Sequence, residues 1–134
     1  MKRLTITALL LAITSNVFAQ SVTPEVLKQA GTAADKQAGS WLSYGKTTSE
    51  TRYSPLKQID ASNVSRLGLA WTYTLGAGGS NQEGTPLVWN DMLFGITTWS
   101  VVYALDARTG KEIWRWDPEV NQSTVRSKIC CGTV

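Results

Sequence analysis

Hydrophobic and polar positions alternate through the second half of the chain. From residue 69 onward the apolar side chains recur with a period of two, and many are β-branched or aromatic, as on half-buried strands. The pattern predicts strands over 70–75, 85–89, 92–97, 101–106 and 112–116. Turn sequences at Asn90-Asp91 and 106–110 would join successive strands as antiparallel hairpins.

The last four of these strands predict one antiparallel sheet. Such a sheet forms either one blade of a β-propeller or one layer of a β-sandwich, and periodicity does not choose between them. A sheet of this size covers at most one of its two faces by itself, so further sheets are expected beside it. We therefore predict an all-β fold class.

The first half of the chain has a different pattern. Thr23 and Pro24 are typical of a helix start, because threonine caps free N–H groups and proline suits the first helical position. Gly31 would end this helix, and Asp60 would cap a second short turn. The polar stretch between them contains the large side chains of Trp41, Leu42 and Tyr44. We expect residues 20–68 to form an extended arm with short helices, held by aromatic anchors.

The first 19 residues are typical of a secretory signal. Lys2 and Arg3 precede an apolar stretch over 4–13, and residues 17–19 fit the small-residue cleavage pattern. A membrane-spanning helix requires about 20 apolar residues, roughly twice this stretch. We expect cleavage after residue 19 and a mature chain in the bacterial periplasm, where disulfides persist.

Composition excludes several classes of function. The formal charge is +3, from 13 Lys and Arg against 10 Asp and Glu, and removing the two basic residues of the signal leaves 11 against 10. These charges are spread along the chain, so we expect no nucleic-acid binding. Histidine is absent, which excludes serine–histidine catalysis and imidazole zinc sites in these residues.

Residues 104–114 carry the most informative motif, Ala-x-Asp-x-x-Thr-Gly-x-x-x-Trp. Asp106 and Thr109 can bond the backbone of a turn, and Gly110 can adopt a positive φ. Trp114 then follows on the returning strand. The motif predicts a rigid turn with an aromatic side chain beside it, although an ordinary hairpin would fit the same residues.

The two cysteines are adjacent, at Cys130-Cys131. Neighbouring Cα atoms lie ~3.8 Å apart across a trans peptide, closer than the roughly 4.4–6.8 Å of ordinary disulfides. A bond between them would close a strained ring, and its flat, polarizable face would suit a planar cofactor. Two separate thiols, or bonds to other chains, fit the adjacency as well.

Glu83 stands at the entry to a predicted strand. Thr85-Pro86 enforces an extended start for that strand, which holds Glu83 at its amino-terminal mouth. Loops at such positions collect ligands in propellers. A solvated loop carboxylate is the alternative.

These motifs, in this order, resemble those of the quinoprotein and quinohaemoprotein alcohol dehydrogenases, which depend on pyrroloquinoline quinone (PQQ). The resemblance runs from about residue 41 to residue 134 and includes the aromatic segments 41–45 and 52–56. It implies an eight-bladed β-propeller in which each motif tryptophan packs between neighbouring blades, and residues 69–134 would form the start of that propeller. It also implies that Glu83 contacts PQQ and that Cys130-Cys131 form a vicinal disulfide walling the quinone pocket.

The resemblance implies an activity as well. It is the oxidation of a primary alcohol to an aldehyde by a periplasmic enzyme with PQQ and bound Ca²⁺, which passes electrons to a cytochrome c or a membrane quinone. The family's catalytic Asp, its calcium ligands and an Arg expected after the cysteine pair have no counterpart in these residues. We therefore expect an N-terminal fragment that is inactive alone. A haem c domain, in members that have one, would lie downstream.

Two other functions stay open. A noncatalytic β-propeller scaffold of the outer-membrane assembly type is built from similar repeats of the tryptophan motif. Such a scaffold would not need Glu83 together with Cys130-Cys131. An independent small β domain with an interaction role would leave apolar strand faces and edges open to aggregation.

Overall fold

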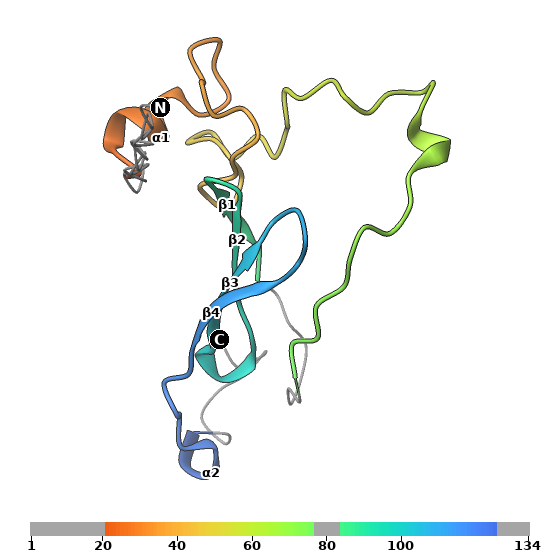
Figure 1. Cartoon of the computed structure of the whole chain (residues 1–134). Helices are drawn as coiled ribbons and strands as arrows, with labels where there is room; N and C mark the ends of the chain where they lie inside the picture. Colours follow the sequence, from red (N-terminus) through yellow and green to blue (C-terminus); the bar gives the residue numbers. More distant parts are fainter. Residues whose placement is uncertain (1–20, 77–83, 126–134) are drawn as a thin grey trace, which may run out of the picture.

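The computed structural model describes residues 21–76 and 84–125. A four-stranded antiparallel sheet with the order β1-β2-β3-β4 forms the centre of this part of the chain (Figure 1). The strands are β1 (Leu87–Trp89), β2 (Met92–Ile96), β3 (Val102–Asp106) and β4 (Glu112–Trp116). The helical segments are α1 (Pro24–Gln29), α2 (Gln122–Val125) and the 3-10 turns η1 (Val64–Arg66) and η2 (Thr98–Ser100). None of these described helices is long and apolar enough to cross a membrane.

Four of the five predicted strands are confirmed. β4 has the predicted bounds, whereas β1 begins at Leu87 rather than at residue 85. Asn90 and Asp91 join β1 to β2 with φ values of 51° and 58°, a pair of left-handed residues that suits the twist of a tight hairpin.

The predicted strand over 70–75 is wrong. These residues have no strand pairing in the structure. The segment lies over one face of the sheet and is held there by its side chains, with the Tyr73 ring centroid 5.2 Å from that of Tyr103. An alternating pattern reports two differing sides of an extended segment, and a segment that packs by side chains alone satisfies it equally.

The core lies around β3. Ala104 and Leu105 are 0% and 1% exposed, and Tyr103 and Trp89 are each 7% exposed. On the face that the 70–75 segment leaves uncovered, strand register aligns Leu87 with Phe94, Phe94 with Ala104, and Ala104 with Trp114. This row is apolar, and its two outer members, Leu87 and Trp114, are 38% and 43% exposed.

Both predicted caps in the first half of the chain are confirmed. The Thr23 hydroxyl accepts a hydrogen bond from the Val26 N–H at the start of α1, and Gly31 takes a φ of 74° just beyond its end. The Asp60 carboxylate accepts from the Ser62 N–H at 2.7 Å ahead of η1. These local signals work because each cap satisfies N–H groups that the short turn leaves free.

The prediction of an extended arm is wrong for residues 31–50, which fold into a series of turns. Trp41 attaches the arm through its backbone rather than through its ring, since its N–H and carbonyl pair with those of Val88 at 2.8 and 2.9 Å. Tyr44 and Tyr53 are not anchors, because they are 59% and 61% exposed. The arm is instead held on the outer edge of β1 by backbone bonds and, internally, by a buried lysine.

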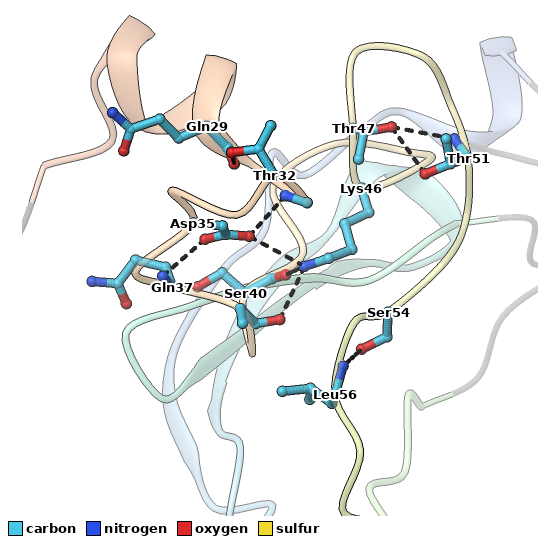
Figure 2. Close-up of polar contacts among 12 residues, drawn as sticks. Gln29, Thr32, Asp35, Gln37, Ser40, Lys46, Thr47, Thr51, Ser54 and Leu56 are labelled. Carbon is cyan, nitrogen blue, oxygen red and sulfur yellow. Dashed lines mark hydrogen bonds and ion pairs between the residues drawn. The ribbon is translucent and has the colours of Figure 1, made fainter.

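That lysine is Lys46, which is 2% exposed. Its ammonium group donates to the carbonyls of Ala38 and Ser40 at 3.0 and 2.6 Å and lies 4.0 Å from the Asp35 carboxylate (Figure 2). Asp35 also accepts from the N–H groups of Gly31 and Gln37, each at 2.8 Å. A buried charge requires such partners, and here they draw three turns of the arm together.

Candidate functional site

The antiparallel topology separates two ends of the sheet with different contents. The docking end consists of the β1–β2 turn at 90–91 and the β3–β4 turn at 106–110. The loop end consists of 84–86, which enters β1, the β2–β3 connection at 97–101, and the segment 117–125 after β4. Figure 1 shows the loop end at the bottom, with η2 in turquoise and α2 in blue.

The three predicted site residues lie outside the described residues. They are Glu83, Cys130 and Cys131. In the sequence, Glu83 comes directly before residues 84–86, and the cysteines follow shortly after α2. The described residues next to them in the sequence therefore belong to the loop end.

The docking end is built as the motif predicts. One oxygen of the Asp106 carboxylate accepts from the Thr109 N–H and hydroxyl, both at 2.8 Å, and from the Arg108 N–H at 3.1 Å. The hydrogen bond from the Thr109 hydroxyl is the main reason why the pKa of Asp106 is lowered. Gly110 has a φ of 71°, a conformation that glycine adopts without a steric cost.

Sequence reasoning missed the aromatic partner of this turn, which is Trp71. The Trp71 ring occupies the space beside Gly110, where a Cβ would lie only 2.5 Å from the nearest ring carbon. The Trp71 indole N–H donates to the Ala107 carbonyl at 3.2 Å. A tryptophan in the 70–75 segment thus docks on the turn that the motif forms, whereas Trp114, the tryptophan of the motif, stays half exposed on β4.

A polar cluster holds the same segment against β4. The Tyr73 hydroxyl bonds the Glu112 carboxylate, and an Arg115 nitrogen lies 3.1 Å from that carboxylate. Burial is the main reason why the pKa of Tyr73 is raised. The hydrogen bond from Tyr73 is the main reason why the pKa of Glu112 is lowered. The cluster positions residues 71–75 across the sheet.

The loop end contains two consecutive residues other than glycine whose backbone is left-handed. Trp99 has φ 67° and ψ 25°, and Ser100 has φ 61°. For a bulky residue such a conformation costs on the order of 1–3 kcal/mol and persists only where the surroundings enforce it. Here the Thr97 N–H donates to the Val101 carbonyl at 2.8 Å, and Thr97 and Thr98 are each 6% exposed.

A cavity of about 230 Å³ adjoins this turn. Thr98 and Trp99 line it, together with Asp117, Glu119 and Gln122 of the segment after β4. No group of three or more His, Cys, Asp or Glu side chains that could hold a metal ion occurs within residues 21–76 and 84–125. The cavity is therefore a polar space bordered by two loops, and its described lining contains no cluster of side chains that could hold a metal ion.

Comparison with known proteins gives a consistent result. Residues 41–134 match the family model described as PQQ: glucose/ethanol/alcohol dehydrogenase, beta-propeller domain. Over 96 residues the chain is 50% identical to the alcohol dehydrogenase (quinone), dehydrogenase subunit, of Gluconobacter oxydans (strain 621H), which covers 72% of this chain and 12% of that protein. Over 102 residues it is 48% identical to quinohemoprotein alcohol dehydrogenase ADH IIB of Pseudomonas putida, covering 76% and 14%.

Solved structures resemble the chain as well. The quinohemoprotein alcohol dehydrogenase ADHIIG of Pseudomonas putida HK5 superposes with a TM-score of 0.74 at 43% identity, over 84% of this chain and 16% of that one. The quinohemoprotein alcohol dehydrogenase of Comamonas testosteroni gives a TM-score of 0.65 at 45% identity, over 71% and 14%. The chain thus spans about one seventh of the length of these proteins.

Proposed function

The chain belongs to the family of PQQ-type glucose, ethanol and alcohol dehydrogenases, and on that basis we propose that it is the amino-terminal part of an exported enzyme that oxidises primary alcohols to aldehydes. Its sheet is part of a β-propeller, which removes the β-sandwich alternative. The observation that carries the activity is the 50% identity to a quinone-type alcohol dehydrogenase across most of the mature chain.

Glu83 and Cys130-Cys131 are proposed to hold PQQ. Support comes from the family match, which spans all three residues, and from the sequence, in which residue 84 and α2, the nearest described parts of the chain ahead of or behind them, belong to the loop end of the sheet. A carboxylate at the mouth of β1 would accept hydrogen bonds from the cofactor, and a vicinal disulfide would offer a flat face to its rings. Both contacts orient the cofactor, which is the usual contribution of the protein in such enzymes.

The bound cofactor with Ca²⁺ would supply the redox chemistry, the cation acting as a Lewis acid on the quinone. The described residues offer no carboxylate cluster for calcium. The cation and the catalytic Asp that would take the alcohol proton are therefore assigned to other parts of the enzyme. In this proposal the fragment builds one wall of the site and does not act alone.

The proposed electron acceptors are a cytochrome c or a membrane quinone, in the periplasm. The names of the relatives support both routes, since some are quinohemoproteins and others are quinone-type dehydrogenase subunits. The competing proposal, a noncatalytic β-propeller scaffold, has no support of this kind among them.

The test uses the full-length protein that contains this chain. The apoprotein is reconstituted with PQQ and Ca²⁺, and dye reduction is followed with a series of primary alcohols. We expect alcohol-dependent turnover that requires both additions, and Cys130→Ser with Cys131→Ser should lower it while the circular dichroism spectrum is unchanged. Tight PQQ binding without any alcohol oxidation would overturn the proposed reaction, and no PQQ binding at all would favour the scaffold. Turnover unaffected by the double substitution would remove the cysteine pair from the site.

A further inference from the structure

The described sheet has two pairs of consecutive left-handed residues, one at each end. At the docking end the pair is Asn90 and Asp91, residue types that tolerate positive φ and are common in tight hairpins. At the loop end the pair is Trp99 and Ser100, which have no such tolerance. The first pair is explained by the hairpin itself, whereas the second requires another cause.

The surroundings of the second pair indicate that cause. The turn is closed by the Thr97 N–H bond to the Val101 carbonyl, and the two threonines at its base are buried. Trp99 lines the cavity that Asp117, Glu119 and Gln122 also line. The left-handed turn and the segment that connects β4 with α2 thus border the same cavity.

We propose that the Trp99–Ser100 turn is a positioning element that fixes the segment 117–125 at the loop end of the blade. This inference rests on the proposed function, because that segment leads the chain toward the cysteine pair that we assign to the PQQ pocket. A fixed turn restricts where the segment begins, and strained backbone at such positions is often retained where a site needs pre-organisation. Trp99 and Ser100 act through the segment and touch no reacting atom.

The matched substitutions are Ser100→Gly and Asn90→Gly. Each places glycine at a left-handed position in a turn of the same sheet, and Ser100→Gly relieves more backbone strain than Asn90→Gly, because asparagine tolerates a positive φ. Only the first loosens the turn beside the cavity. Trp99→Gly is the second probe, because it removes the side chain as well.

The primary measurement is amide hydrogen exchange of residues 117–125 in the full-length apoprotein. We expect Ser100→Gly and Trp99→Gly to accelerate exchange in this segment about tenfold, with no corresponding change for Asn90→Gly. In the same variants the dissociation constant for PQQ, measured by absorbance titration, should rise about fivefold or more, because the pocket is less pre-organised. The melting temperature should be unchanged or higher for Ser100→Gly and Asn90→Gly.

If both loop-end variants behave like Asn90→Gly, the turn has no positioning role and the inference fails. Exchange in the apoprotein does not depend on the cofactor, so the two proposals fail separately. If exchange is faster in the loop-end variants but neither they nor the unaltered protein bind PQQ, the positioning role of the turn is sustained and the proposed function is overturned.

Discussion

The indole ring of Trp71 lies against Gly110, 39 positions along the chain, at a distance that leaves no room for a Cβ. A β carbon built at Gly110 would lie 2.5 Å from one ring carbon and 2.6 Å from the next. The same glycine has a φ of 71°, so its lack of a side chain meets both a conformational and a steric requirement.

Gly110→Ala should therefore destabilise the full-length protein by about 2–4 kcal/mol, because the left-handed strain and displacement of Trp71 add together. Thermal and denaturant unfolding would measure the loss. Gly68→Ala is the matched control, since a Cβ there meets no atom within 4 Å and the position has no left-handed φ. Equal effects at the two positions would contradict the docking role of Gly110.

Trp71 contributes a hydrogen bond and a packed ring, and the two are separable. Trp71→Phe keeps an aromatic ring but loses the N–H that donates to the Ala107 carbonyl, which should cost about 1 kcal/mol. Trp71→Ala also removes the ring, and its cost should rise to about 3 kcal/mol. Chemical denaturation measures the loss in the free energy of unfolding for each variant. Equal losses would show that the ring packing at Gly110 adds no stability.

The sequence predicted the chemistry of the docking turn, because Asp106, Thr109 and Gly110 act on backbone groups within a few residues of themselves. It did not predict their partner. The contact between Trp71 and the turn spans 36 positions from Trp71 to Ala107, and nothing in local pattern selects one tryptophan of six for it. The wrong strand over 70–75 has the same origin, since alternation does not distinguish ladder bonds from side-chain docking.

The candidate site was predictable to a different extent. Motif order led to Glu83 and the cysteine pair, and all three lie outside the described residues. The turn at Trp99 and Ser100 escaped prediction, because neither residue type signals a left-handed backbone. That conformation accompanies tertiary features, the bond from the Thr97 N–H to the Val101 carbonyl and the burial of Thr97 and Thr98, which no local pattern announces.

The pKa of Asp106 gives the docking turn a dependence on pH. Hydrogen bonds from Thr109, its hydroxyl first, lower the pKa of this carboxyl in the folded state. A group with a depressed folded pKa stabilises the protein above its unfolded pKa, and that contribution is lost as the pH falls through the folded value. Asp106→Asn should therefore lower the melting temperature at neutral pH and make its decline below about pH 4 shallower.

Thr109→Val separates this effect from a general loss of charge. It removes the hydroxyl that is the main cause of the shift, so it should flatten the same acid limb while Asp106 is retained. Thr51→Val serves as the control, because the Thr51 hydroxyl bonds Thr47 in the arm. A melting curve for Thr109→Val that keeps the pH dependence of the unaltered protein would exclude the hydroxyl as the cause.

Lys46 organises the arm from its interior, so replacing it should release the arm before the sheet unfolds. Lys46→Met keeps most of the aliphatic volume but leaves the carbonyls of Ala38 and Ser40 without their donor and the Asp35 carboxylate without its cation. Breaking a buried pair from one side costs on the order of 3 kcal/mol. Limited chymotrypsin digestion should then cut at Trp41 or Tyr44 well before it cuts the strands.

Two further variants decide whether charge or packing is responsible. Lys57→Met is the matched control, because the Lys57 ammonium group is exposed on the arm surface beside Tyr53 and its loss should leave the digestion rate unchanged. Adding Asp35→Asn to Lys46→Met should recover part of the protection, since the remaining buried charge is removed while the one amide oxygen still accepts from the N–H group of either Gly31 or Gln37. If the double variant is cleaved as fast as Lys46→Met, the arm depends on the bonds from Lys46 to the two carbonyls, and the ion pair with Asp35 contributes little.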